Sequence, residues 1–486
     1  MYSVTLVNLP TSSLRKPAEH SGIASLHAYL FSKGIDVAII DAYANNIDIE
    51  ECWLLLKQRI DRHPRMIVGF SPFVTSVNEL ITLGERIKNN FPDVLIIVGG
   101  HFATFHKEYL LREYLWLDAV VVGEGECSLY EYTVSPSSNI PGVLKRNTPF
   151  IPRPRIRNLD ILPYQTRYLP PEKLKDEPLS LVTSKGCYAA CTFCSIPTFY
   201  RNNTGSAQSV RSVDHLMSEI KALIQLYQKN SFKIVDDNFF RITDKNDQFL
   251  VDLVAEIKKL GIDLIFRLSA RPNDLTESRV KLLKEMGTNV VAIGGESAHE
   301  DSLVLFNKRL TVADSKRAAR VLKKYGITPL MNFITFDPIL DIDGLKLNLE
   351  FIKEHMTFCV FHRINSHLWL RSTDPILQRL VDLGLVTGDI NSFPYVSYSY
   401  KHPEVFLIKK YFDYYCAQNM RDYYAVVETL MAPNEPPTDK TWKKYHEFMI
   451  QDTKMLEQLI KRCEEGTLKE TDIITKELFD DLRLFV

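Results

Sequence analysis

The stretch Ser184–Cys194 reads Ser-Lys-Gly-Cys-Tyr-Ala-Ala-Cys-Thr-Phe-Cys and holds three of the chain's eight cysteines. Cys187, Cys191 and Cys194 lie four and three residues apart, so one loop can wrap three sulfurs around a soft metal centre. Structural zinc takes four ligands, and no second CxxC or CxH follows nearby. A disulfide would leave one cysteine unpaired. The spacing favours a four-iron, four-sulfide cluster with one iron open to a small molecule.

Strand and helix patterns alternate around this loop, which follows the first of six strand candidates. These are Leu179–Thr183, Phe232–Val235, Leu264–Leu268, Val290–Gly294, Thr328–Thr335 and Phe358–Ile364. The helical patterns between them are Val213–Gln228, Asp247–Lys259, Glu277–Met286, Val312–Tyr325 and Leu345–His355. Six such units predict a partial (βα)6 barrel of the TIM type, with its chemistry where strands end and loops begin.

The first 133 residues show the same alternation. Apolar β-branched runs appear at Val4–Asn8, Asp36–Asp41, Met66–Ser71, Val94–Val98 and Ala119–Val122. Continuous apolar strands joined by helices predict a parallel sheet covered on both faces. We therefore expect an α/β, doubly wound, Rossmann-like (flavodoxin-like) domain whose ligands lie beyond the carboxyl ends of the strands.

Four regions follow from these patterns. Residues 1–133 form the Rossmann-like domain, and residues 179–370 form the barrel. Between them, residues 134–178 hold nine of the 24 prolines, which indicates a linker, because proline donates no hydrogen bond to a sheet and resists helix. Residues 371–486 are aromatic and mostly helical in pattern, which predicts a helical C-terminal domain.

Composition narrows the class of protein. Hydrophobic residues make up 45% of the chain and charged residues 24%, which is typical of a globular protein. Lys+Arg is 59 against Asp+Glu 60, so we expect no broad nucleic-acid footprint and no anionic-membrane surface. No apolar run approaches the roughly 18 residues of a membrane helix, and the N-terminus reads as a strand rather than an export signal. These features predict a cytoplasmic protein.

The segment Cys187–Cys194 resembles the CxxxCxΦC signature of the radical SAM superfamily, with Phe193 as the aromatic position. The resemblance implies that the three cysteines ligate a [4Fe-4S] cluster whose open iron chelates S-adenosylmethionine, with Phe193 in the S-adenosylmethionine site. It also implies reductive cleavage to a 5′-deoxyadenosyl radical, with electrons from an external one-electron reductant such as flavodoxin or ferredoxin. A covered barrel mouth suits such a radical.

Two further strand ends resemble this family. Asp237 and Asn238 stand where members place polar groups against the methionine moiety of S-adenosylmethionine. Glu296, in Ile293-Gly294-Gly295-Glu296-Ser297, stands where members approach the ribose and the carboxylate. These three residues are therefore the candidates for binding S-adenosylmethionine. The alternatives remain an aspartate-rich turn that caps the next helix, and a carboxylate favoured at a helix N-terminus.

The chain departs from the family after the fifth barrel strand. Members often carry a Gly-rich, Glu-containing turn there, whereas this chain has Phe333–Pro338, so its adenine contacts are not assigned. Arg267 and Arg271, near the third strand, are possible carboxylate clamps, although surface arginines are commoner.

The N-terminal domain resembles the cobalamin-binding domain that precedes the barrel in one large radical SAM branch. Short motifs at strand carboxyl ends carry this resemblance, and paired glycines let the backbone approach a bulky ligand. The candidates for binding cobalamin are Asn8, Pro10, Ser71, Thr75, Ser76, Gly99, Gly100, His101, Gly123 and Glu124. The alternative is that the glycines make turns and the serines cap helices.

The expected first loop lacks the DxHxxG pattern by which such domains supply a histidine to cobalt. The corresponding residues, Arg15–Gly22, place His20 outside that pattern. We therefore expect no imidazole from this loop on cobalt. Relatives without the pattern include cobalamin users and members thought not to need cobalamin. The resemblance therefore implies the family of the domain more strongly than it implies bound cobalamin.

These resemblances favour a cobalamin-dependent radical SAM C-methyltransferase acting on an unactivated carbon of a small-molecule or natural-product intermediate. The main alternative is an epimerase, deoxygenase, cyclase or rearranging enzyme, with Cys359 or Cys416 as a quencher of the product radical. A tRNA methylthiotransferase would need a second cluster, but the N-terminal domain has only Cys52 and Cys127. A cluster-bearing sensor or scaffold would not cleave S-adenosylmethionine.

The C-terminal residues match no pattern that identifies a substrate. In this branch such segments usually cover the barrel mouth, which makes Tyr398, Tyr400, His402 and Tyr411 candidates for lining a substrate pocket. Aromatic helix packing explains these side chains equally well.

Overall fold

The computed structural model describes residues 1–11, 18–175, 177–201, 207–241, 247–432 and 438–469. The chain divides into two compact units. Of the described residues, the first unit comprises those within Met1–Lys175 and Ser195–Arg211, and the second comprises those within residues 177–194 and 212–469. Two segments therefore belong to the first unit although the sequence predicted a linker for one and the barrel for the other. The proline-rich segment up to Lys175 belongs to the first unit, and so do the residues that directly follow Cys194.

The first unit is built on a sheet of order β2-β1-β3-β4-β5-β6, in which β1 to β5 are parallel. The strands are β1 Ser3–Asn8, β2 Val37–Asp41, β3 Met66–Phe70, β4 Leu95–Val98, β5 Ala119–Val121 and β6 Val143–Leu144, with a short β9 Ser209–Val210 besides. The predicted doubly wound sheet is thus confirmed. The proline-rich segment adds β6, which pairs antiparallel to β5 with Val121 opposite Val143.

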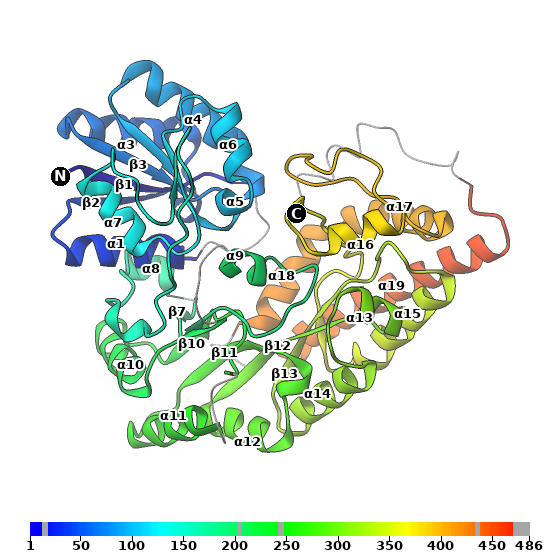
Figure 1. Cartoon of the computed structure of the whole chain (residues 1–486). Helices are drawn as coiled ribbons and strands as arrows, with labels where there is room; N and C mark the ends of the chain where they lie inside the picture. Colours follow the sequence, from blue (N-terminus) through cyan, green and yellow to red (C-terminus); the bar gives the residue numbers. More distant parts are fainter. Residues whose placement is uncertain (12–17, 176, 202–206, 242–246, 433–437, 470–486) are drawn as a thin grey trace. The chain divides into compact units, whose positions relative to one another are not determined.

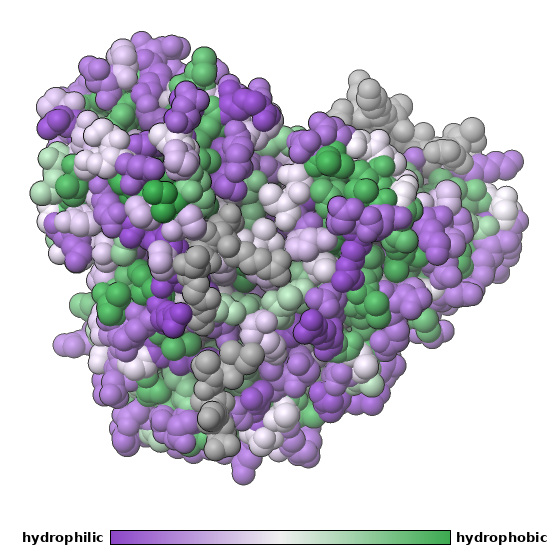
Figure 2. All heavy atoms as spheres, in the orientation of Figure 1, coloured by the Kyte–Doolittle hydropathy of each residue, from purple (hydrophilic) through white to green (hydrophobic). Residues whose placement is uncertain are grey.

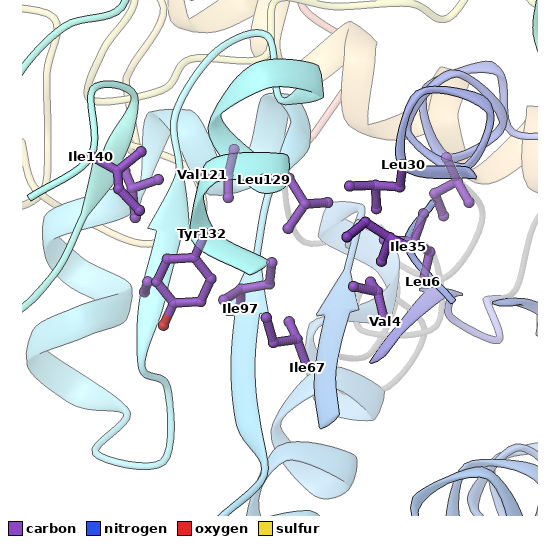
Figure 3. Close-up of a cluster of buried hydrophobic side chains, with 13 residues drawn as sticks. Val4, Leu6, Leu30, Ile35, Ile67, Ile97, Val121, Leu129, Tyr132 and Ile140 are labelled. Carbon is purple, nitrogen blue, oxygen red and sulfur yellow. The ribbon is translucent and has the colours of Figure 1, made fainter. Parts of the chain in front are cut away.

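Helices connect these strands. They are α1 Ser21–Ser32, α2 Ala42–Asn45, α3 Ile49–Arg62, η1 Val74–Ser76, α4 Val77–Asn90, α5 Gly100–Phe105, α6 Lys107–Glu113, α7 Glu126–Val134, η2 Leu159–Ile161, α8 Pro171–Leu174 and α9 Ser195–Arg201. Aliphatic side chains from one face of the sheet meet those of α1 and α7, as Figure 3 shows for Leu6, Leu30, Ile97 and Leu129. Burial of this apolar surface stabilises the unit.

The second unit contains a six-stranded, all-parallel sheet of order β14-β13-β12-β11-β10-β7. Its strands are β7 Leu179–Leu181, β10 Ser231–Ile234, β11 Ile265–Ala270, β12 Thr288–Glu296, β13 Thr328–Phe333 and β14 Val360–Phe361, with a short β8 Ser184–Lys185 after β7. Among the described residues, β7 pairs only with β10 and β14 only with β13, so this sheet does not close. The predicted partial (βα)6 barrel is confirmed (Figure 1).

The helices of this unit follow the predicted order, and the C-terminal part is helical as expected. They are α10 Val213–Tyr227, α11 Gln248–Lys259, η4 Pro272–Asp274, α12 Glu277–Met286, α13 Glu300–Leu305, α14 Val312–Lys324, α15 Ile342–His355, α16 Ile376–Asp382, α17 Pro403–Ala417, α18 Met420–Met431 and α19 Asp439–Glu464. Local signals set several ends: Thr311 and Asp314 form a capping box on α14, and Gly287 ends α12 at φ +96°.

Two tyrosines of the C-terminal helices form hydrogen bonds with the backbone groups at the open sheet edge near β14. Tyr445 of α19 donates to the carbonyl of Cys359 (3.1 Å) and accepts from the amide of Phe361 (2.8 Å). Tyr423 of α18 donates to the carbonyl of Phe361 (2.9 Å). Buried backbone groups require such partners, so these hydroxyls take the place of a seventh strand.

Among the described residues, no helix has both the length and the apolar character needed to cross a membrane. In the view of Figure 2, hydrophilic side chains cover most of the visible face, and hydrophobic ones are interspersed among them.

Replacing Tyr445 with Phe should destabilise the second unit. The change leaves the buried amide of Phe361 without a partner, at a cost of about 1–3 kcal/mol, which corresponds to roughly 2–4 °C in Tm per kcal/mol. Differential scanning calorimetry measures the shift. Tyr414→Phe on α17 is the control, because that ring is 37% exposed and its loss should leave Tm nearly unchanged. Equal Tm values for the two variants would contradict the edge-closing role of Tyr445.

Candidate functional site

The cysteine loop begins directly after the first barrel strand, where a (βα) barrel carries its chemistry. Gly186 has φ +90°, a conformation that favours glycine, and turns the chain into the loop. Cys191 is buried, whereas Cys187 and Cys194 are half-buried. Cys187 accepts a hydrogen bond from the amide of Ala189 (3.4 Å), and burial raises the pKa of its thiol. The three predicted ligands thus stand on one short loop at the barrel mouth.

The donor set suits an iron–sulfur cluster. Within the described ranges, no three His, Cys, Asp or Glu side chains gather around one point as the ligands of a single ion do. A four-iron cluster does not require this, because each of its three thiolates binds a different iron. Three cysteines on one loop are the donor set that leaves the fourth iron open.

Two carboxylates that follow β10 hold the start of this loop. Asp236, which is buried, accepts from the amide and hydroxyl of Thr183 (2.7 and 2.5 Å) and from the hydroxyl of Ser184 (2.8 Å). Burial raises the pKa of the Asp236 carboxyl, and these donors oppose the shift. Asp237 accepts from the amide of Gly186 (2.7 Å). Asp237 therefore fixes the residue before Cys187, and Asp236, which sequence reasoning did not single out, fixes the strand end before it.

The second half of the loop is held by the turn after α13. Thr192 donates through its amide to the carbonyl of Phe306 (2.9 Å) and through its hydroxyl to that of Leu305 (2.8 Å). Asn307 donates to the carbonyl of Ala190 (2.7 Å). Phe193 meets Phe306 edge to face, with 5.1 Å between ring centroids, and packs against an apolar cluster of this unit. The aromatic position of the motif thus anchors the loop.

An ion pair covers Gly294 near the end of β12. Glu296, 8% exposed and at φ +66°, pairs with Lys308 at 2.7 Å. A Cβ on Gly294 would lie 2.6 Å from the Glu296 carboxylate and 2.7 Å from Lys308 Nζ. A methyl group at position 294 would therefore push the ends of both side chains aside, because the pair lies directly over the strand. Lys308 is a second residue that the sequence did not mark as functional.

Asn238 ties together the ends of β10 and β11. Its amide nitrogen donates to Asp274 (3.2 Å), and its oxygen accepts from the backbone amide of Arg271 (3.1 Å). The Arg271 guanidinium in turn lies 3.3 Å from the sulfur of Cys191. Asn238 is 1% exposed and is engaged by the chain itself. In this structure Asn238 therefore fixes the positions of Arg271 and Asp274 beside the site.

In the first unit, Asn8 ends β1 beside the end of β2. Its amide nitrogen donates to Asp41 (2.8 Å), while its oxygen is buried and has no partner in the described part of the chain. Pro10 follows in the half-buried loop. An unpaired buried oxygen is costly unless a ligand or water satisfies it. It lies at the carboxyl end of the sheet, where a nucleotide-like ligand is expected.

The backbone comes close to a neighbouring loop at Gly99–Gly100, after β4. Gly100 has φ +84°, and a Cβ there would lie 2.9 Å from the hydroxyl oxygen of Ser71. Ser71 Oγ is 3.2 Å from His20 Nε2, and His20 Nδ1 accepts from the amide of Ile23 as the cap of α1. The strand ends of β3 and β4 thus meet, and both ring nitrogens of His20 are engaged within the protein. Arg15–Pro17, from the same loop, lie outside the described residues.

Two hydroxyl candidates serve local structure. Ser76 exchanges hydrogen bonds with the backbone of Phe73, at 3.0 and 3.2 Å. Thr75 accepts from the hydroxyl of Thr11 (2.6 Å), which links the loops after β1 and β3. The interpretation of Ser76 as a capping residue agrees with these contacts, and Thr75 shapes the ligand edge of the sheet.

The candidates after β5 are also paired. The amide of Gly123 donates to the hydroxyl of Thr104 (3.0 Å). Glu124 forms a buried ion pair with Arg155 (3.2 Å), so its charge is balanced inside the unit. This region stabilises the end of the sheet.

His101 is the most exposed of the predicted cobalamin residues, and an aromatic ring covers one of its faces. The Phe199 ring from α9 stacks on it, with 4.0 Å between centroids and an interplanar angle of 8°. The segment that follows the cysteine motif therefore covers a predicted ligand residue of the first unit.

The cysteines proposed to quench a product radical are deeply buried. Cys359 and Cys416 are 0% exposed, and burial raises the pKa of both thiols. Such thiols act as small apolar side chains. Tyr400 is 7% exposed, and Tyr398 donates to the carbonyl of Leu368 (2.7 Å). For these tyrosines the structure favours packing.

Comparisons with known proteins agree with both units. Residues 181–352 match the family model of the radical SAM superfamily, and residues 11–132 match that of the B12 binding domain. A Pyrococcus horikoshii protein named an uncharacterized methyltransferase is 30% identical over 370 residues, covering 72% of this chain and 78% of the relative. Hopanoid C-3 methylase of Methylococcus capsulatus is 27% identical over 351 residues, 69% of this chain and 64% of the relative.

The fold is similar to that of a solved structure. The cobalamin-dependent S-adenosylmethionine radical enzyme OxsB, with aqua-cobalamin and S-adenosylmethionine bound, matches with a TM-score of 0.78 at 20% identity. The match covers 100% of this chain and 75% of that one.

Replacing Asp236 with Asn should weaken iron incorporation. The amide cannot accept all three hydrogen bonds from Thr183 and Ser184, so the loop with Cys187 loses its fixed start. Loss of such an outer partner lowers metal affinity by about 10-fold or more. Iron per protein, measured after anaerobic reconstitution with limiting iron and sulfide, tests this. Asp263→Asn, at an exposed position before β11, is the control, and equal iron content in both variants would contradict the role of Asp236.

Proposed function

Since the chain belongs to the radical SAM superfamily, in the branch with a B12-binding domain, we propose that it is a cobalamin-dependent C-methyltransferase. Its cofactors are a [4Fe-4S] cluster, S-adenosylmethionine and cobalamin. The substrate of the proposed reaction is a small molecule that accepts the methyl group on an unactivated carbon. The observation that carries the proposal is one chain with a three-thiol loop at the mouth of a partial barrel and a separate B12-binding domain.

Three side chains bind the cluster in this proposal. Cys187, Cys191 and Cys194 each hold one iron, and the fourth stays open for the amino and carboxylate groups of S-adenosylmethionine. When bound, the cofactors supply an electron, a 5′-deoxyadenosyl radical and a transferable methyl group. An external one-electron reductant, such as flavodoxin or ferredoxin, delivers the electron.

The polar groups around the loop orient S-adenosylmethionine in this proposal. Glu296 accepts from the ammonium or a ribose hydroxyl, and Lys308 balances its charge at 2.7 Å. Asp237 and Asn238 hold the strand end against the methionine moiety, and Phe193 lies beside it. Buried charges of both signs suit a zwitterionic amino acid, because each charge of the ligand finds its opposite.

Cobalamin binds at the carboxyl edge of the first sheet in this proposal. The unpaired oxygen of Asn8 and the close backbone at Gly99–Gly100 make the ligand edge, and Ser71 and Thr75 line it. His101 presents an imidazole partly covered by Phe199. The remaining candidates, Pro10, Ser76, Gly123 and Glu124, shape the loops around this edge.

Product analysis tests the proposal. Anaerobically reconstituted protein with cobalamin, S-adenosylmethionine and dithionite should release 5′-deoxyadenosine, and Cys191→Ala should release none. With a methyl acceptor, S-adenosylhomocysteine should form in step with 5′-deoxyadenosine. Release of 5′-deoxyadenosine alone, by protein that turns over substrate without cobalamin, would replace methyl transfer with the epimerase, deoxygenase or cyclase class. No cleavage of S-adenosylmethionine in cluster-loaded protein would reject radical chemistry.

Replacing Gly294 with Ala should weaken S-adenosylmethionine binding. The added methyl group displaces the ends of Glu296 and Lys308, and overpacking of this kind costs about 1–3 kcal/mol, which corresponds to roughly 5- to 150-fold in affinity. Anaerobic titration calorimetry measures Kd. Gly388→Ala is the control, because a Cβ there would be 3.5 Å from Ser397, an ordinary contact. An unchanged Kd in cluster-loaded Gly294→Ala would contradict the placement of S-adenosylmethionine at this pair.

A further inference from the structure

Arg271 lies directly after β11, and its guanidinium stands beside Cys191 of the metal loop. The side chain is 7% exposed. Its Nη1 is 3.3 Å from the sulfur of Cys191, and its Nη2 donates to the carbonyl of Lys308. Both terminal nitrogens therefore already have partners within the protein, which differs from the carboxylate clamp considered from the sequence.

The guanidinium is held by its two hydrogen bonds, to Cys191 and to the carbonyl of Lys308, and the backbone of Arg271 is fixed as well. The backbone amide of Arg271 donates to Asn238 (3.1 Å). Its guanidinium carbon lies 5.8 Å from the centroid of the Tyr188 ring, and the Tyr188 hydroxyl donates to Asp274 (2.8 Å). Its Nε is buried without a hydrogen-bond partner in the described chain. Few rearrangements are open to a side chain fixed in this way, so its positive charge stays beside Cys191.

A cation that donates a hydrogen bond to a thiolate ligand changes the reduction potential of the metal centre that the thiolate binds. Adding an electron makes a cluster more negative, and a nearby buried positive charge stabilises that form more than the oxidised one. Hydrogen bonds to cluster sulfurs act in the same direction. Screening of this contact is weak, because both Arg271 and Cys191 are buried.

We propose that Arg271 is a positioning residue that raises the reduction potential of the [4Fe-4S] cluster through its hydrogen bond to Cys191. The proposal rests on the proposed function in one respect, the ligation of the cluster by Cys191. The step concerned is the one-electron reduction of the cluster, with the electron taken from flavodoxin, ferredoxin or, in the test, dithionite. Arg271 makes that electron easier to accept and exchanges no atom.

The test is a redox titration of reconstituted full-length protein, with the reduced cluster quantified by electron paramagnetic resonance and no substrate or S-adenosylmethionine present. Arg271→Met removes the charge and the donor. At a fixed potential its ratio of reduced to oxidised cluster should fall about tenfold, which for one electron is about 59 mV. Arg271→Lys, which keeps the charge on a shorter reach, should fall about threefold, a shift of roughly half that size.

Arg267→Met is the matched control. Arg267 stands on β11, the strand that Arg271 follows, and has the same charge, but its nitrogens lie near the carbonyl and sulfur of Met431 (3.4 and 3.5 Å). Its loss should leave the potential unchanged. A potential in Arg271→Met equal to that of the wild type, with four irons per chain in both, overturns the proposal. If Arg271→Met does not load four irons, a wild-type potential in Arg271→Lys overturns it instead.

The two proposals fail in different ways. Wild-type protein that binds no four-iron cluster rejects the assignment of the cysteine loop, whatever the role of Arg271. Wild-type and variant proteins that load equally and titrate equally reject Arg271 alone. A shift of the same size in Arg267→Met would assign the effect to net charge rather than to the bond with Cys191.

Discussion

The buried carboxylate of Asp236 is the contact on which the site depends most. It accepts three hydrogen bonds from Thr183 and Ser184, at the point where the first barrel strand becomes the cysteine loop. A loop that must present three sulfurs to one cluster cannot be free to move, because each misplaced thiolate would lose its iron. The neighbouring Asp237 extends this restraint to Gly186, and the turn after α13 holds the other end of the loop. The positions of the three cysteines are therefore fixed by residues that are not themselves ligands of the cluster.

An open barrel needs a second restraint at its far edge. The sheet ends at β14, whose backbone amide and carbonyl groups would otherwise lack partners. The hydroxyls of Tyr423 and Tyr445 form hydrogen bonds with these groups. The C-terminal helices thus belong to the same compact unit as the barrel and complete it. Arg363, which follows β14, forms a buried ion pair with Asp452 of α19 at 2.9 Å. This pair also connects α19 to the same edge of the sheet.

The strands of both sheets and the metal loop could be predicted from the sequence because their signals are local. Apolar runs between helical patterns mark β1 to β5 and the six barrel strands, and the spacing of Cys187, Cys191 and Cys194 is readable in eight residues. The contacts of Lys308 and Arg271 were not readable, since their partners are fixed only when strand ends meet in space. The antiparallel β6 was missed because proline content obscured a two-residue strand. For Ser76 and Glu124 the sequence position was misleading in the other direction. Both follow strands at the expected ligand edge, but each is bound to a partner within the protein.

The central claim is that three cysteines hold a cluster whose fourth iron is open to S-adenosylmethionine. Electron paramagnetic resonance of the reduced, reconstituted protein, recorded before and after addition of S-adenosylmethionine, tests it most directly. The account predicts the signal of a [4Fe-4S] cluster that changes in shape and g-values when S-adenosylmethionine occupies the open iron. A signal that S-adenosylmethionine leaves unchanged, or anaerobically prepared protein that carries zinc in place of iron, would contradict it.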